Sequence, residues 1–181
     1  MEFIEKTKSE KEIYSGRVLR LHVDEVELQN GRTSIRECVD HRGGVCVAVL
    51  TEKDEMLFVR QFRYPYRQAV LEAPAGKLEK GEAPFEAMKR EQKEETGTTG
   101  SEYFDLGKLY PSPGYTNEII YLYACRAASF GDTKFDDDEF LQVERIPVDE
   151  AVKMAMNNEI PDAKTQVLIF KTAQLLKEGK I

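Results

Sequence analysis

The chain has 181 residues and a formal net charge of −7, so its length suits one domain with a small appendage. The acidic balance argues against general nucleic-acid binding, but not against a phosphorylated substrate held through a divalent cation. Three widely spaced cysteines suggest neither a disulfide framework nor a CxxC metal site. They fit reduced thiols. With no apolar leader and no apolar run near about 18 residues, we expect a soluble cytoplasmic protein that does not enter a membrane.

The first part of the sequence predicts paired antiparallel strands. The run LHVDEVELQ alternates apolar and polar residues, and TSIRECVD returns after Asn30-Gly31, a strong hairpin signal. Residues 1–43 look too small and flat to bury their own core. We expect a small β-rich part that packs on the rest of the chain or on a second subunit.

Residues 44–181 predict a mixed sheet between helices. Two apolar runs, GGVCVAVLTE and EMLFVRQFR, predict buried strands, and AVLEAPAG predicts a short strand that ends in a kink. A helix then begins near Pro84 and stops at Gly97. Further strands flank a loop at 111–117, and two helices close the chain. This order indicates the α/β (α+β) class.

The predicted helix after Pro84 carries Glu91, Glu94 and Glu95 on neighbouring turns of one face. Like charges at these spacings oppose helix formation. Either the interleaved lysine and arginine side chains dilute the charge on a solvated surface, or a cation binds there. Hard cations such as Mg²⁺ prefer carboxylate and carbonyl oxygens. Gly76 would let the preceding loop turn back, so that the carbonyl of Ala75 can face the helix.

The stretch GKLEKGEAPFEAMKREQKEETGT, residues 76–98, resembles the signature of the Nudix hydrolases, G-x5-E-x7-R-E-U-x-E-E-x-G-U, where U is a bulky apolar residue. Both U positions depart, because they hold Gln92 and Thr98. A buried Gln92 must find partners or cost about 1–3 kcal/mol, so we expect it to lower stability while leaving the carboxylates in place. Every fixed position matches: Gly76, Glu82, Arg90, Glu91, Glu94, Glu95 and Gly97.

This resemblance implies a Nudix-type α/β/α sandwich and a Mg²⁺ site, with Mn²⁺ as the alternative ion. Glu91 and Glu95 would be direct ligands together with the carbonyl of Ala75. Glu94 would support them or hold another ion, and Glu82 would be hydrogen-bonded or lie in the outer coordination sphere.

We call residues 76–98 the Nudix box. The sequences that flank this box resemble the ADP-ribose pyrophosphatase group of the family. They comprise the run VRQFRYPYRQAVLEAPAGKLEKGE, the loop YPSPGYTNE, the acidic DDDEF and the strand-rich start of the chain. HRGG at residues 41–44 departs from the group's more frequent His-Pro-Gly-Ala. The resemblance implies hydrolysis of ADP-ribose to AMP and ribose 5-phosphate. Two alternatives stay open, a hydrolase of another nucleoside diphosphate sugar and a module that senses ADP-ribose without cleaving it.

Hydrolysis by water requires a base that accepts a proton. In this group the base comes from the later acidic loop, so Asp137 and Glu139 are the candidates, with a glutamate of the box such as Glu94 as the other choice. Arg90 is expected to pin a carboxylate through a bidentate contact.

Substrate-binding candidates come from both flanks of the box. Arg60 and Arg63 lie in a strand-like run, and arginine suits bidentate phosphate binding. The family points to Arg63, with Glu72 as a contact to the adenine or ribose side. Each of these residues could instead form an ordinary salt bridge.

The loop after the box supplies further candidates. Pro113, at the place of the group's marker proline, and Gly114 would shape the pocket wall, and Glu118 would contact the ligand or cap the loop. Tyrosines could stack on adenine or fill sheet edges: Tyr64, Tyr66 and Tyr115. The group commonly forms dimers in which the N-terminal part crosses to its partner, so a homodimer through residues 1–43 is expected.

Overall fold

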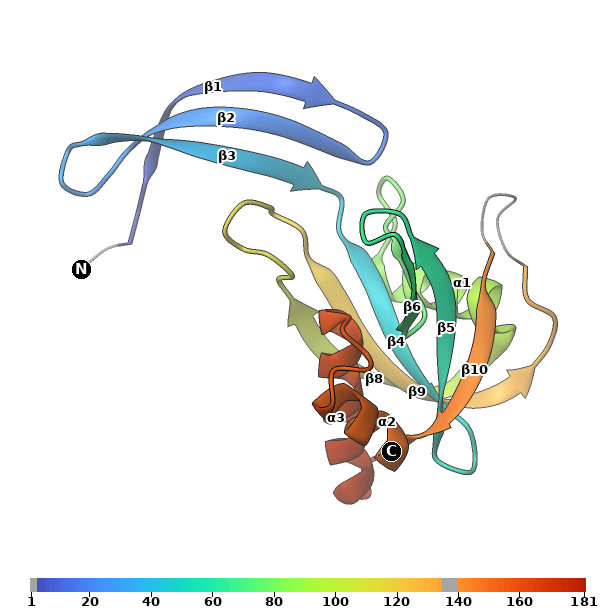
Figure 1. The fold of residues 1–181 in the computed structure, drawn as a ribbon. Coiled ribbons are helices and arrows are strands. Elements are labelled where there is room, and N and C mark those ends of the chain that lie inside the picture. The colour runs from blue at the N-terminus through green and yellow to red at the C-terminus, as the bar shows by residue number, and fades with distance from the viewer. Residues whose placement is uncertain (1–2, 135–139) are drawn as a thin grey trace. The chain divides into compact units, whose positions relative to one another are not determined.

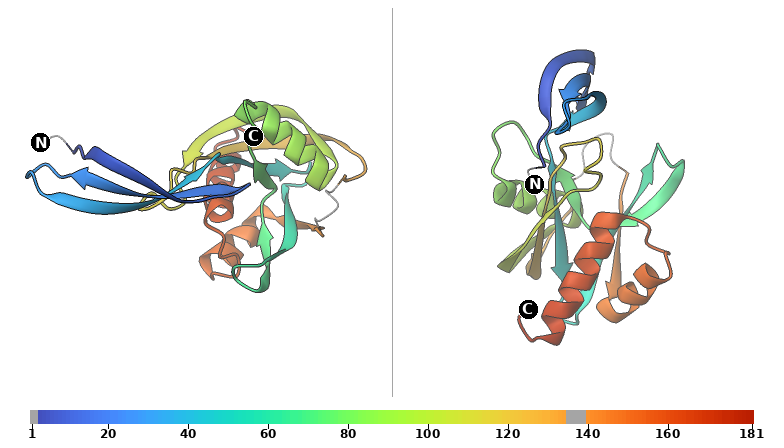
Figure 2. Two further views of the ribbon diagram at one scale, coloured as in Figure 1. Left: turned by 90° about the horizontal axis from the view of Figure 1, so that it is seen from above. Right: turned by 90° about the vertical axis from the view of Figure 1, so that its left-hand side faces the viewer.

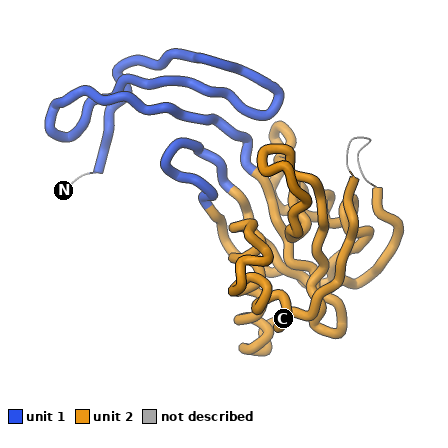
Figure 3. The backbone as a smooth tube through the Cα atoms, viewed as in Figure 1, with its two compact units in different colours: residues 1–43, 110–119 blue, residues 44–109, 120–181 orange. Residues whose placement is uncertain are grey.

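The computed structural model describes residues 3–134 and 140–181. The chain divides into two compact units, which Figure 3 colours separately. The first unit comprises residues 1–43 and 110–119, and the second comprises residues 44–109 and 120–181. The predicted mixed α/β class and the small antiparallel N-terminal sheet are both confirmed.

The first unit is built on a three-stranded antiparallel sheet of order β1-β2-β3 (Figure 1), with β1 at Lys6–Ser15, β2 at Leu19–Glu27 and β3 at Thr33–His41. The predicted hairpin joins β2 to β3. Gly31 adopts a left-handed φ of 78° and donates its N–H to the carbonyl of Leu28 at 2.9 Å. Val39 pairs with Thr116, which attaches the 110–119 loop to this sheet.

The second unit contains a mixed sheet of order β10-β5-β4-β9-β8, with β6 paired to β5 and β7 paired to β4. The β4–β9 pair is parallel, whereas β5, β6, β8 and β10 pair in antiparallel fashion. The strands are β4 Gly44–Leu50, β5 Glu55–Arg63, β6 Gln68–Glu72, β7 Ala75–Lys77, β8 Thr98–Leu109, β9 Ile120–Phe130 and β10 Gln142–Pro147.

Helices cover both faces of this sheet, as Figure 2 shows. Helix α1 (Pro84–Thr96) lies on one face, and α2 (Val148–Met156) and α3 (Ala163–Lys177) lie on the other. Because successive side chains of a strand point to opposite faces, Val47 of β4 packs with Met88 of α1, while Ala48 packs with Leu168 of α3. Every residue of β4 is therefore buried, which explains its continuous apolar run.

Helix α1 begins and ends where the sequence predicts. Pro84 occupies the first turn, and Gly97 ends the helix in the left-handed region with a φ of 66°. Its N–H donates to the carbonyl of Lys93 at 3.0 Å. The strand β7, which precedes α1, is held against β4 through the pairs Cys46–Ala75 and Val45–Gly76. This pairing fixes the backbone that faces the helix.

The thiols of Cys46 and Cys125 are fully buried, and burial raises the pKa of both, that of Cys125 to about 12. Such thiols are unreactive. Across residues 3–134 and 140–181, no helix combines the length and apolar character that a bilayer crossing requires.

Candidate active site

The centre of the candidate site is the contact between β7 and α1. A Cβ atom placed on Gly76 would lie only 1.8 Å from the carboxyl carbon of Glu91. Gly76 does not have a positive φ, so its backbone conformation does not require glycine. The position needs glycine because the Glu91 carboxylate fills the space that a side chain would take. This reason differs from the chain reversal expected from the sequence.

The carboxylate of Glu95, one helical turn further on, faces the same strand. Its Oε2 accepts a hydrogen bond from the N–H of Ala75 at 2.8 Å, and the residue is 3% exposed. Two glutamate carboxylates therefore lie against consecutive residues of β7. Taking negative charge out of water is costly unless it is paired, and carboxylate and carbonyl oxygens are the ligands that Mg²⁺ prefers. The donors present fit a hard divalent cation.

Arg90 holds the box together from one side. Its Nε and Nη2 donate to the carboxylate of Glu82 at 2.9 and 3.0 Å. Its Nη1 donates to Glu91 at 2.8 Å and to Glu94 at 3.1 Å. The hydrogen bonds to Glu82 are the main reason that the pKa of Arg90 is raised, and Arg90 in turn lowers the pKa of Glu82. The guanidinium thus relieves part of the repulsion among the glutamates and fixes their directions.

The two departures from the Nudix signature are hydrogen-bonded to each other. Gln92 is fully buried, and its Nε2 donates to Oγ1 of Thr98 at 3.0 Å. The hydroxyl of Tyr103 donates to Oε1 of Gln92 at 3.1 Å, and the thiol of Cys125 lies 3.7 Å from the same oxygen. The buried amide therefore has partners for both its nitrogen and its oxygen, and the unpaired-amide cost considered above does not arise.

Arg63 and Glu72 form an ion pair in the second unit. Nε and Nη2 of Arg63 donate to the two carboxylate oxygens of Glu72 at 2.6 and 2.7 Å, and Lys164 also donates to Glu72. Burial opposes ionisation of Glu72, but the hydrogen bonds of Arg63 and the charge of Lys164 outweigh it, so the pKa of Glu72 is lowered. Arg60 likewise pairs with Glu144 at 2.5 Å. Arg60, Arg63 and Glu72 therefore all form salt bridges, which is the alternative that the sequence left open for these substrate-binding candidates.

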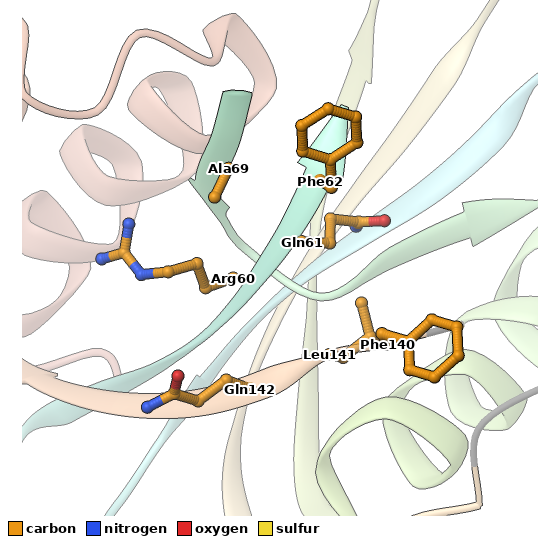
Figure 4. A pocket seen from close by; sticks show the side chains of 7 residues that line it. All are labelled: Arg60, Gln61, Phe62, Ala69, Phe140, Leu141 and Gln142. Atoms are coloured by element: carbon orange, nitrogen blue, oxygen red, sulfur yellow. The ribbon is translucent and has the colours of Figure 1, made fainter. Parts of the chain in front are cut away.

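A hollow of about 430 Å³ opens beside β5, β6 and β10 (Figure 4). It contains Arg60 and two aromatic side chains that the sequence analysis did not single out, Phe62 and Phe140, which are 60% and 87% exposed. The available signal was the sequence RQFR, in which Phe62 is an apolar residue among polar neighbours at the end of β5. The lining residues are Arg60, Gln61, Phe62, Ala69, Phe140, Leu141 and Gln142.

The remaining candidates fall into three places. Pro113, Gly114 and Glu118 belong to the first unit, where Oε1 of Glu118 lies 3.3 Å from Nδ1 of His41. The tyrosines are exposed: Tyr64 and Tyr66 follow β5, with the Arg67 guanidinium 3.5 Å from the Tyr64 ring, and Tyr115 belongs to the first unit. Asp137 and Glu139 lie outside the described residues.

This arrangement, in which a loop–helix–loop presents glutamate carboxylates beside a mixed sheet, is the one that the resemblance to the Nudix hydrolases implies. Sequence models of two known domains match the chain. The NUDIX domain matches residues 40–166, and the nucleoside diphosphate sugar hydrolase N-terminal domain matches residues 5–39. The chain therefore belongs to the Nudix family, and it is a Nudix pyrophosphohydrolase.

Individual relatives are similar over nearly their whole length. The ADP-ribose pyrophosphatase of Bacillus subtilis (strain 168) is 40% identical over 91% of this chain and 90% of its own. The methanol dehydrogenase activator of Bacillus methanolicus is 41% identical over 92% and 91%. A crystal structure of an ADP compounds hydrolase superposes with a TM-score of 0.83 over 98% of this chain and 97% of that chain, at 19% identity. This last likeness supports the fold.

Proposed function

We propose that the protein hydrolyses the pyrophosphate bond of ADP-ribose to AMP and ribose 5-phosphate in a Mg²⁺-dependent reaction. The observation that carries the proposal is the placement of the Glu91 and Glu95 carboxylates against Gly76 and Ala75. The similarity to the B. subtilis ADP-ribose pyrophosphatase supports the choice of substrate.

In this proposal Glu91, Glu95 and the carbonyl of Ala75 hold the ion, and Mn²⁺ can replace Mg²⁺. When bound, the ion neutralises phosphate charge and lowers the pKa of the attacking water. Arg90 positions Glu91 and Glu94 through its two contacts at 2.8 and 3.1 Å. Glu94 helps to hold the ion.

The proton of the water is accepted by Asp137 or Glu139 of the acidic loop, or by Glu94 of the box. The Glu94 side chain is 39% exposed, so solvent and substrate can reach it.

Substrate contacts in the second unit are assigned to Arg60 and Arg63. The side chains of both are 39% exposed, and phosphate oxygens can accept from guanidinium groups that a carboxylate already orients. Glu72 is 2% exposed, so its role is to position Arg63. The exposed rings of Phe62 and Phe140 offer stacking surfaces for a base.

Pro113, Gly114 and Glu118 of the 110–119 loop are proposed as substrate-binding residues. We also propose that the chain has two functional parts: residues 1–43, which form the dimerising part, and residues 44–181, which form the hydrolase domain.

A homodimer through the N-terminal sheet is also part of the proposal. Ile13 and Tyr14 of β1 and Ile35 of β3 are 50%, 57% and 57% exposed, and burying these side chains against a partner would remove apolar surface from water. Sedimentation should give twice the mass of the chain, and a monomer at micromolar concentration would contradict the dimer. The free cysteines fit a reducing compartment, so we place the protein in the cytoplasm.

The test is a substrate panel with product identification. The protein is incubated with ADP-ribose, GDP-mannose and other nucleotide sugars, each with Mg²⁺, with Mn²⁺ and with a chelator. We expect AMP and ribose 5-phosphate from ADP-ribose with either ion and neither product with the chelator. Turnover confined to GDP-mannose would transfer the chemistry to another substrate. Tight ADP-ribose binding without hydrolysis under any divalent ion would replace the enzyme with a sensing module.

A further inference from the structure

A cluster of metal-ligating side chains lies in the first unit, in residues that the proposed reaction does not use. His22 and Asp24 are two residues apart on β2, so both side chains point to the same face of the sheet. Cys38 of β3 is directly opposite His22 in the strand register. One ligand atom from each of the three residues lies within 4.8 Å of the other two.

Two members of this cluster are buried. His22 is 7% exposed and Asp24 is 8% exposed, and Nδ1 of His22 lies 2.7 Å from Oδ1 of Asp24. Buried ionisable groups of a small surface sheet call for a partner that compensates their desolvation. Here the three residues offer each other an imidazole nitrogen, a carboxylate oxygen and a sulfur atom within a small volume.

Two more carboxylates stand at the rim of the cluster. A Glu10 oxygen lies 3.8 Å from Nδ1 of His22, and an Asp40 oxygen lies 3.6 Å from Nε2. Arg20 donates hydrogen bonds to both carboxylates, so they are held in place beside the histidine. Either one can complete the coordination of an ion or hydrogen-bond its fourth ligand.

We propose that His22, Asp24 and Cys38 form a binding site for a zinc-type divalent transition metal, separate from the carboxylates of the Nudix box. Zinc takes nitrogen, sulfur and carboxylate ligands at about 2.0–2.3 Å in a tetrahedron, so ligand atoms around one ion lie roughly 3.5 Å apart. To meet this separation, the 2.7 Å contact between Nδ1 of His22 and Oδ1 of Asp24 must open, and ligand atoms that now lie up to 4.8 Å apart must draw closer. Mg²⁺ prefers oxygen ligands, so the thiol separates the metal preference of this site from that of the box.

The sheet that carries the site has little apolar core of its own. Among residues 3–43 and 110–119, Val26 is the only apolar side chain that is buried. Small domains with small cores often rely on a structural metal for stability, and metal binding then contributes directly to folding. The metal would tie β2 to β3 at the His22–Cys38 pair.

The experiment uses Co²⁺ as a spectroscopic substitute for Zn²⁺ in the full chain, with excess Mg²⁺ present to occupy the box. We expect one equivalent of Co²⁺ to produce thiolate-to-cobalt charge-transfer absorption, which Zn²⁺ then abolishes. Cys38→Ser should remove that absorption. Cys46 and Cys125 remain in both proteins, so the comparison is its own control for the other thiols.

Affinity and folding provide the second readout. The Zn²⁺ dissociation constant should rise by at least about 100-fold in Cys38→Ser and in Asp24→Asn, since the loss of an outer-shell partner alone costs about 10- to 100-fold. Zinc should also slow hydrogen exchange of β2 and β3 amides in the wild-type protein, with α1 unaffected.

Three results would overturn the site. One is a wild-type protein without charge-transfer absorption, and another is equal absorption in Cys38→Ser. The third is Zn²⁺ binding that Asp24→Asn leaves unchanged. If Cys38→Ser does not fold, as judged by circular dichroism, Asp24→Asn and the wild-type spectrum decide the matter.

Discussion

Substituting Gly76 with alanine tests the geometry of the box most sharply, because the new methyl group would occupy the place of the Glu91 carboxylate. The added Cβ would lie 1.8 Å from the carboxyl carbon and 1.9 and 2.3 Å from its oxygens. To reach an ordinary contact of 3.4 Å, the carboxyl carbon must retreat by about 1.6 Å. The obstacle is the end of a flexible side chain, so the fold should persist while Glu91 moves.

The size of the effect follows from that displacement. Metal–ligand distances hold to about ±0.2 Å, and a misplacement of about 1 Å in a catalytic arrangement costs roughly 100-fold in rate. We therefore expect kcat/KM for ADP-ribose to fall about 100-fold, equivalent to about 2.7 kcal/mol, with a higher Mg²⁺ requirement. Steady-state kinetics across a Mg²⁺ series, together with thermal unfolding, measures both quantities.

The matched control is Gly131→Ala, whose added Cβ would meet its nearest atom, the carbonyl oxygen of Gly97, at 3.5 Å. This variant should keep wild-type kinetics. Wild-type turnover and Mg²⁺ dependence in Gly76→Ala would refute the reasoning, because the methyl group would then have displaced nothing that the reaction needs. An equal loss in Gly131→Ala would point to a general effect of added side chains.

Two further predictions concern buried polar groups. Since the pKa of Glu72 is lowered from 4.5, its contribution to stability is present above pH 4.5 and is lost as the pH falls below that value. Glu72→Gln should lower the free energy of unfolding by about 3 kcal/mol at pH 7. This is the low end for breaking a buried pair, because Arg63 is partly exposed and Lys164 retains its ion pair with Asp162 at 2.9 Å. Between pH 7 and pH 4, the free energy of unfolding measured in urea should fall less in the variant than in the wild-type protein. An equal fall in the two proteins would contradict this reasoning. Gln92→Leu should destabilise by about 1–3 kcal/mol by unpairing its partners, whereas the double variant with Thr98→Val should lose less than the two single losses combined. Strict additivity in chemical denaturation would show that the two residues are not coupled.

The local patterns of the sequence were enough for the box and for the strands that surround it. The predicted strand EMLFVRQFR coincides with β5. Its apolar run predicted a buried strand, and the turn before it marked where the strand begins. The strand β1 was not predicted, since its ten residues are all exposed and show no apolar alternation. This strand forms because it pairs with β2, and no local sequence pattern predicts that pairing.

Contacts between distant residues account for the rest. Lys164 reaches Glu72 across 92 positions of the chain, and Gln92 meets Cys125 across 33, so neither partner can be read from neighbouring residues. Gly76 was recognised from its spacing in the Nudix signature. The reason that the position requires glycine is that the Glu91 carboxylate fills the space of a side chain, and this becomes visible only when the helix is packed against the strand. The family and the enzyme class followed from the box, because its spacing encodes one local structure.

The proposed reaction depends most directly on magnesium uptake by the box carboxylates. Calorimetric titration of Mg²⁺ can measure this uptake for the wild-type protein and for Glu95→Gln in the presence of a non-hydrolysable ADP-ribose analogue. Glutamine keeps an oxygen that can accept the 2.8 Å hydrogen bond from Ala75, so the variant should fold normally. We predict that the wild-type protein binds Mg²⁺ and that the variant binds it at least about 100-fold more weakly. Equal affinity in the two proteins, or no uptake by the wild type with or without nucleotide, would contradict the account.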